Sequence, residues 1–196
     1  LTAAFGLKVP LPELCFLQLA TQLPLPHLAM AGMELCGTYA VSPDGEGALV
    51  QRRPLATCST LLSLLEKSPS SYGVKKARRV LSFIADGAAS PQEARLHLLL
   101  SLPVRLGGYG LPPAQLNYRI ETNASGGVDP VKRYRLCDLY WPDRQVAVEY
   151  DSDAFHTGAE KIASDSIRRA ALSTRGVSVV TVTGAQLKSP MMTDQL

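Results

Sequence analysis

Apolar residues recur at helical spacing through the first half of the chain. Pro12, which suits the first turn of a helix, precedes leucines at positions 14, 17, 19 and 23. Gly37 follows a second such segment, as glycine often does where a helix ends. The pattern therefore predicts a smaller, mainly helical N-terminal region over residues 1–87. Its helices are expected at about 12–23, 27–35, 55–66 and 74–86.

The stretch 14–36 is apolar enough to raise the question of a membrane span. His27 and Glu34 add polar groups to this stretch, and Pro24 and Pro26 interrupt its helical hydrogen bonding. We therefore expect two core helices that are separated by a Pro-Leu-Pro elbow, and no membrane partner.

After residue 87 the pattern changes to mixed α/β. Ser90, Pro91 and Glu93 have the form of a capped helix start, and this helix should reach about residue 102. The apolar run 177–182 predicts a strand that is buried on both faces. We expect an α/β domain over residues 88–196, with the domain boundary in the segment 87–91. Its other strands are expected at 115–120, 134–141 and 146–151, and a helix from about 157 should end at Gly176.

The strands 134–141 and 146–151 are expected to form a hairpin that gathers acidic residues. Side chains alternate across a strand, so Glu149 and Asp151 share one face. If Trp141 faces Val146 across a four-residue turn, Asp138 falls opposite Glu149, with the Cβ atoms about 5 Å apart. Three carboxylates on one patch repel one another, and a hard divalent cation would relieve that repulsion. The alternative interpretation is an ordinary exposed hairpin with acidic residues on its solvated side.

Five short motifs follow one another over about residues 90–187: Ser90-Pro91-x-Glu93, Cys137-Asp138-Leu-Tyr-Trp-Pro-Asp, Val-Ala-Val-Glu149-Tyr-Asp151, Phe155-His156 and Asp165-x-x-Arg168-Arg169. Their order and spacing resemble the PD-(D/E)XK nuclease superfamily. Within it, the chain is most similar to a branch of uncharacterised bacterial endonuclease-like domains related to the very-short-patch mismatch repair endonuclease. The resemblance implies a restriction-endonuclease-like mixed sheet flanked by helices. It also implies Mg²⁺-dependent (or Mn²⁺-dependent) hydrolysis of phosphodiester bonds in DNA.

The same resemblance implies roles for the acidic residues. Asp138 and Glu149 would be metal ligands, and Asp151 would be a ligand or an orienting acid. Glu93 would be an outer member of the catalytic site, although a helix cap alone also explains it. A metal ion held there would polarise the phosphoryl oxygen and lower the pKa of the attacking water.

The base that activates water stays open between two residues. Asp151 stands where ordinary members of the superfamily have lysine, so the base would be His156 or Lys161. His156 falls where the branch carries a catalytic histidine, but it is also explained as a loop histidine. Asp165 falls where the branch carries a later aspartate, but Lys161 and Arg169 four residues away on either side also explain it as part of a helical ion-pair ladder. Loss of catalytic activity is therefore an open alternative.

The formal net charge of +3 and a pI of about 8.7 permit a nucleic-acid partner without demanding one. Clusters of basic residues could neutralise phosphates, or they could simply be solvated faces. The candidates for DNA contact are Lys75, Lys76, Arg78 and Arg79 on one helix, Lys132 and Arg133 ahead of the acidic hairpin, and Arg168 and Arg169.

The composition is that of a globular protein, with 46% apolar and 19% charged residues. The four cysteines have no CxxC spacing, which predicts neither a structural zinc site nor a disulfide framework, but reduced thiols in a cytoplasmic protein. Because the chain opens at Leu1 without a methionine, we expect a fragment. The oligomeric state is not indicated by the sequence.

These observations lead to a metal-dependent DNA endonuclease as the expected function. The alternative is a catalytically silent nuclease-fold binding module, working as a regulator or an antitoxin-like partner. A structural or interaction protein without a nucleic-acid partner is a third possibility.

Overall fold

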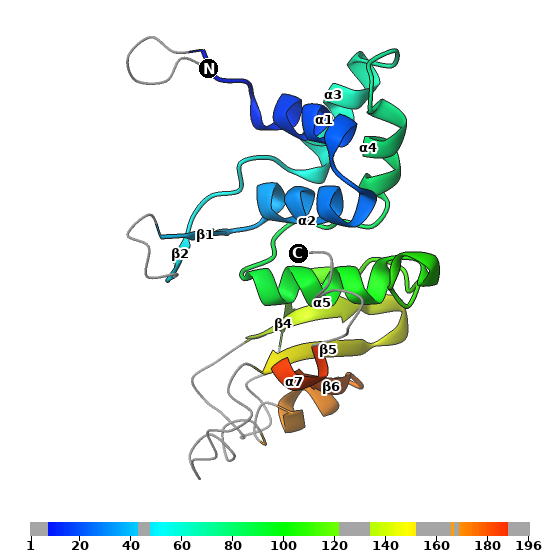
Figure 1. The fold of residues 1–196 in the computed structure, drawn as a ribbon. Helices are drawn as coiled ribbons and strands as arrows, with labels where there is room; N and C mark the ends of the chain where they lie inside the picture. Colours follow the sequence, from blue (N-terminus) through cyan, green and yellow to red (C-terminus); the bar gives the residue numbers. More distant parts are fainter. Residues whose placement is uncertain (1–7, 43–47, 122–133, 152–165, 167–168, 188–196) are drawn as a thin grey trace. The chain divides into compact units, whose positions relative to one another are not determined.

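The computed structural model describes residues 8–42, 48–121, 134–151, 166 and 169–187. The chain divides into two compact units, Leu1–Pro113 and Ala114–Asp194. Helices and a two-stranded sheet build the first unit, and the second contains a mixed four-stranded sheet (Figure 1). The expected fold class, an α/β protein in which helices precede a mixed sheet, is confirmed.

Two helices that begin near prolines open the first unit. α1 covers Pro12–Gln22 and α2 covers Leu25–Cys36, so the predicted break between two core helices is confirmed. The helices pack closely at Gly32, where an added methyl group would lie 3.0 Å from the ring of Phe16 and 2.9 Å from Ile84. Among the described residues, no helix combines the length and the apolar character that crossing a bilayer requires.

A small hairpin, three further α-helices and a short 3-10 helix (Val104–Leu106) follow in the described part of the first unit. The hairpin consists of β1 (Tyr39–Val41) and β2 (Leu49–Gln51), which run antiparallel. A reciprocal capping box of Thr57 and Thr60 starts the next helix. The three helices are α3 (Cys58–Lys67), α4 (Val74–Leu81) and α5 (Pro91–Ser101).

Helix α5 begins where the sequence predicts. The hydroxyl of Ser90 accepts a hydrogen bond of 3.2 Å from the backbone N–H of Glu93, and Pro91 occupies the first helical position. α5 packs against α2 inside the first unit. The two compact units divide after Pro113, while the domain boundary expected near residue 87 stays a prediction.

The sheet of the second unit has the order β3-β4-β5-β6. β3 and β4 are antiparallel, as are β4 and β5, whereas β5 and β6 are parallel. Its core contains residues from β3, β4 and β5 and from the segment before β6: Ile120, Cys137, Tyr140, Ala147, Leu172 and Val177. The strands are β3 (Gln115–Glu121), β4 (Tyr134–Trp141), β5 (Val146–Asp151) and β6 (Ser178–Thr183).

The strand β6 corrects one expectation from the sequence. It is the outermost strand of the described sheet, and Val180 is 50% exposed, so the prediction of burial on both faces is wrong. An apolar run of β-branched residues suits a pleated strand at an edge as well as at the centre of a sheet. The glycine expected at the preceding helix end is confirmed, because Gly176 adopts φ 74°.

Candidate functional site

The hairpin of β4 and β5 has the register that the sequence predicts. Trp141 faces Val146 and Leu139 faces Val148 in the antiparallel ladder. The same register continued by one residue places Asp138 opposite Glu149. The turn between the strands is a short 3-10 helix, Pro142–Arg144.

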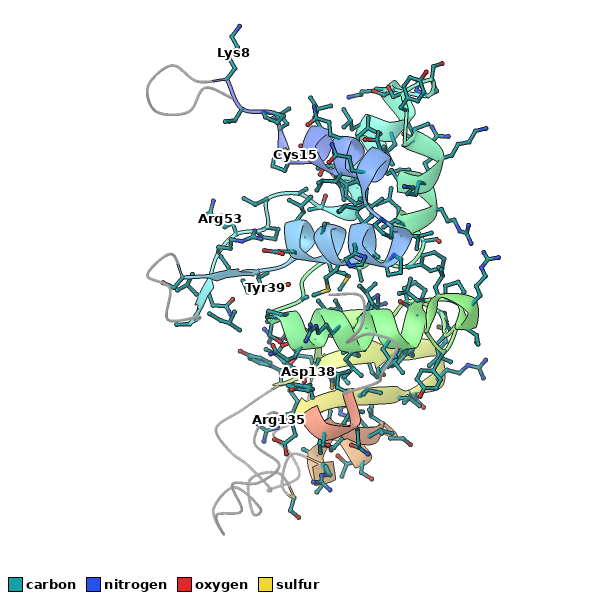
Figure 2. The ribbon with its side chains drawn as sticks, viewed as in Figure 1. Lys8, Cys15, Tyr39, Arg53, Arg135 and Asp138 are labelled. Carbon is teal, nitrogen blue, oxygen red and sulfur yellow. The ribbon has the colours of Figure 1, made fainter. Side chains whose placement is uncertain are left out.

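Asp138 lies where the backbone ladder between these strands ends. Its Oδ2 atom accepts a hydrogen bond of 2.8 Å from the backbone N–H of Tyr150. At this position the side chain of Asp138 accepts the interstrand hydrogen bond that a backbone carbonyl of the neighbouring strand usually accepts in a sheet. This bond fixes the carboxylate at β5, next to the position of Glu149. Figure 2 shows Asp138 on the ribbon of β4.

The ladder on the other side of Asp138 is interrupted as well. Leu116 pairs with Leu139 and Tyr118 pairs with Cys137, but Asn117 between them is skipped. Asn117 has φ 47°, a left-handed conformation that asparagine tolerates better than most residues. Such local departures from regular strands re-aim side chains and are frequent next to active sites. No pattern in the sequence predicts this kink.

Glu149 and Asp151 lie on the same face of β5, because they are two residues apart in one strand. Both strand positions are paired to β6, Glu149 with Thr181 and Asp151 with Thr183. Asp138, Glu149 and Asp151, the acidic trio, are all half-buried, and the Oε1 atom of Glu149 is shielded from solvent. The trio is therefore not on a freely solvated face.

The chemistry of the acidic trio suits a hard cation, but its geometry limits how one could be held. Mg²⁺ takes oxygen ligands at about 2.0–2.1 Å in an octahedron, so direct ligand atoms lie within about 4.2 Å of one another. Within the described part of the chain, the trio does not bring three ligand atoms within 4.8 Å of one another. Mg²⁺ is often bound by one or two carboxylates with waters and substrate phosphate, and the trio fits that mode. A set of three direct ligands stays a prediction that requires the side chains to move closer together.

Glu93 caps helix α5. Its Oε1 atom accepts a hydrogen bond of 3.0 Å from the hydroxyl of Ser90, and its Oε2 atom accepts one of 2.9 Å from the backbone N–H of Ala89. The cap accounts for Glu93 in the sequence without a catalytic role. A role as an outer member of the site stays a prediction. Six other predicted site residues, the alternative base Lys161 among them, lie outside the described residues: Lys132, Arg133, His156, Lys161, Asp165 and Arg168.

The basic face of α4 divides into two kinds of residue. The ammonium of Lys76 donates to the carbonyl of Leu23 at 2.9 Å, and the guanidinium of Arg78 donates to the carbonyl of Leu65 at 3.0 Å. Both carbonyls lie at C-terminal ends of helices, where cations complement the helix dipole. Lys76 and Arg78 therefore have a structural role, although Arg78 is exposed, as are Lys75 and Arg79, and Lys76 is half-buried.

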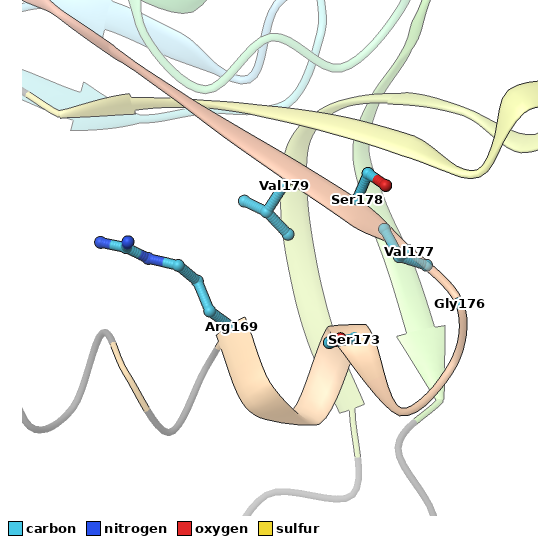
Figure 3. A pocket seen from close by; sticks show the side chains of 6 residues that line it. All are labelled: Arg169, Ser173, Gly176, Val177, Ser178 and Val179. Atoms are coloured by element: carbon cyan, nitrogen blue, oxygen red, sulfur yellow. The ribbon is translucent and has the colours of Figure 1, made fainter.

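Arg169 borders a shallow hollow in the second unit. The hollow measures about 430 Å³ and lies between the helical residues 169–173 and the start of β6 (Figure 3). Its other lining residues are small and uncharged: Ser173, Gly176, Val177, Ser178 and Val179. Arg169 is exposed, and its expected contact with DNA stays a prediction.

The first unit contains a second cluster of potential ligands, which the sequence does not predict. The sulfur atoms of Cys36 and Cys58 and a carboxylate oxygen of Asp86 all lie within 4.8 Å of one another. Contact with the Cys58 side chain, burial and the charge of Asp86 raise the pKa of Cys36 far above its usual range. Cys36 is thus not an activated nucleophile. No local spacing could have revealed a group whose members lie so far apart in the sequence.

Comparisons with known proteins add distant relatives without a known activity. No family model and no solved structure matches the chain. Two uncharacterised proteins of Mycobacterium tuberculosis, from strains CDC 1551 and H37Rv, are each 31% identical over 110 residues, which is 56% of this chain. The match covers 36% of each relative, so the chain spans about a third of their length. Their names state no function.

Proposed function

We propose that this protein is a metal-dependent DNA endonuclease that works in the cytoplasm. The observation that carries the proposal is the position of Asp138, where the ladders to both neighbouring strands are interrupted and its carboxylate is held by the N–H of Tyr150. Glu149 and Asp151 follow on the adjacent strand. The order of the motifs, which resembles the PD-(D/E)XK nucleases, supports the same function.

Each acidic residue has a distinct part in this proposal. The bond from Tyr150 fixes the orientation of the Asp138 carboxylate, and a carboxylate oxygen is a ligand that a hard cation takes. Glu149 would share the cation, and Asp151 would orient water or a second ligand. A bound Mg²⁺ or Mn²⁺ would supply Lewis-acid polarisation of the scissile phosphate. Either His156 or Lys161 would take the proton from water.

The test is nicking of supercoiled plasmid DNA with Mg²⁺ or Mn²⁺. We expect Asp138→Asn and Glu149→Gln to lower the nicking rate about 100-fold or more, because each removes a negative charge from the site. Asp138→Asn keeps an oxygen acceptor for Tyr150, so its melting temperature should stay close to that of wild type. Asp138→Ala leaves that N–H without its acceptor and should cost about 1–3 kcal/mol of stability.

The matched control is Asp143→Asn, which removes a carboxylate from the exposed turn of the same hairpin. Its nicking rate should equal that of wild type. An absence of nicking by wild-type protein at every divalent-ion concentration rejects the endonuclease. Equal nicking by Glu149→Gln and wild type would also reject it, since the activity would then belong to a contaminant.

A catalytically silent binding module is the second candidate. It is favoured by Asp151 at the position of the usual lysine and by an acidic trio that is too open for a three-ligand site. This candidate predicts DNA or protein binding that is unchanged by EDTA and by Asp138→Asn. Gel-shift and pull-down measurements with and without EDTA distinguish it from the enzyme.

A further inference from the structure

Cys36, Cys58 and Asp86 come from three separate segments of the first unit. Cys36 is the last residue of α2, and Cys58 is the first residue of α3. Asp86 lies in the segment between α4 and α5. Their sulfur and oxygen atoms all lie within 4.8 Å of one another, the one such group of three potential ligands among the described residues.

Backbone hydrogen bonds hold these three segments together independently of the side chains. The N–H of Gly87 donates to the carbonyl of Cys36 at 3.0 Å, which joins the Asp86 segment to the end of α2. The N–H of Leu55 donates to the carbonyl of Leu35 at 2.9 Å, which joins the chain ahead of α3 to the same helix end. The positions of the three ligands are therefore built into the fold.

Asp86 is also oriented within the group. Its Oδ1 atom accepts a hydrogen bond of 2.8 Å from the backbone N–H of Cys58, at the start of α3. The carboxylate is thereby aimed at the two sulfur atoms while it remains exposed to solvent. Cys58 is half-buried and Cys36 is buried, so the group is open on one side and closed on the other.

We propose that Cys36, Cys58 and Asp86 form a binding site for a soft divalent cation, with Zn²⁺ as the expected ion. Zn²⁺ binds thiolate sulfur at about 2.3 Å in a tetrahedron, which places two such sulfur atoms about 3.8 Å apart. The observed spacing accommodates this arrangement. Two thiolates select Zn²⁺ over Mg²⁺ and Ca²⁺, which prefer oxygen ligands. The exposed side leaves the fourth position to water or to a ligand from a partner.

The test uses the full reduced chain and Co²⁺ as a spectroscopic probe for Zn²⁺. Thiolate coordination of Co²⁺ gives a strong near-ultraviolet absorption, which should saturate at one equivalent and disappear when Zn²⁺ displaces Co²⁺. Binding should release protons from the thiols, measured with a pH indicator. Zn²⁺ should also raise the melting temperature of the wild-type protein.

Three variants and a control test the ligand set. Cys58→Ser and Cys36→Ser should abolish the cobalt absorption, and Asp86→Asn, which keeps an acceptor for the N–H of Cys58, should weaken binding by about 10-fold or more. Cys15→Ser removes a thiol that lies outside the group and should change nothing. If the Cys36→Ser variant does not fold because Cys36 is buried, the Cys58→Ser and Asp86→Asn variants still test whether this group binds the cation.

Two outcomes overturn the proposal. One is the absence of thiolate-to-cobalt absorption in the reduced wild-type protein. This absence overturns the proposal also where Cys36 and Cys58 formed a disulfide before the protein was reduced. The other is equal absorption in wild type and Cys58→Ser. Neither outcome bears on the proposed nuclease, because that activity depends on carboxylates of the second unit.

Discussion

His97 shows at the scale of one residue how the fold sets the charge of a side chain. The imidazole is 1% exposed, and its Nε2 atom donates to the carbonyl of Phe83 at 2.9 Å. Its Nδ1 atom is buried and has no hydrogen-bond partner among the described residues. Burial lowers the pKa of His97 from 6.5 to about 4, and the bond to Phe83 offsets this only in part.

The lowered pKa of His97 predicts a loss of stability in weak acid. Between pH 6.5 and about 4 the unfolded chain binds a proton at His97 that the folded chain does not bind. The stability contribution is therefore fully present above pH 6.5 and is lost as the pH falls toward 4, up to roughly 3 kcal/mol. Urea denaturation at about pH 7.5, 5.5 and 4.5 measures this dependence, because the first value lies above the window and the other two lie within it.

The replacement His97→Gln should flatten the pH dependence in this window, because glutamine does not titrate. His27→Gln, on α2, serves as the control and should leave the dependence in place. A wild-type protein whose unfolding free energy is constant between pH 6.5 and 4.5 would contradict the assignment.

At the scale of elements, the sequence predicts those features that depend on residues close together in the chain. The capped start of α5 at Ser90 follows from a short signature that acts within one turn. The register of β4 and β5 follows from the turn length and from alternation along the strands. The kink at Asn117 and the exposure of β6 could not be predicted, because the first has no sequence signature and the second depends on which strand ends the sheet.

Helix α4 yields a prediction at the same scale. Lys75, Arg78 and Arg79 are exposed and Lys76 is half-buried, but Lys76 and Arg78 also donate to carbonyls at the ends of neighbouring helices. The double change of Lys75 and Arg79 to Gln should weaken DNA binding and lower the slope of log affinity against log salt by about 1–2, because two phosphate contacts are lost. Fluorescence anisotropy with a labelled duplex at several salt concentrations measures both quantities.

The double change of Lys76 and Arg78 to Gln is the matched control, since it removes the same charge from the same helix. It should lower the stability by about 1–2 kcal/mol through the two lost hydrogen bonds and weaken DNA binding less. If both doubles weaken DNA binding equally, net charge alone determines binding and α4 presents no specific DNA-contacting face.

At the scale of the whole molecule, tertiary packing brings together potential ligands that are far apart in the sequence. The sequence predicts acidic residues on one hairpin because they are close along the chain. It does not predict the group of Cys36, Cys58 and Asp86, because backbone bonds between three distant segments bring these residues together. The spacing of residues along the chain can predict a site within one supersecondary element, but not a site that is assembled from several distant segments.

The two proposed cation sites lie in different compact units and differ in ligand chemistry, which predicts that they function independently. The acidic trio offers oxygen ligands to a hard ion, and the cysteine group offers sulfur to a soft one. Cys58→Ser should therefore keep Mg²⁺-dependent nicking while it loses cobalt absorption. Glu149→Gln should show the reverse. Because each variant serves as the folding control for the other, a loss of both properties in either variant would show that the units are coupled, and the assignment of two separate sites would then fail.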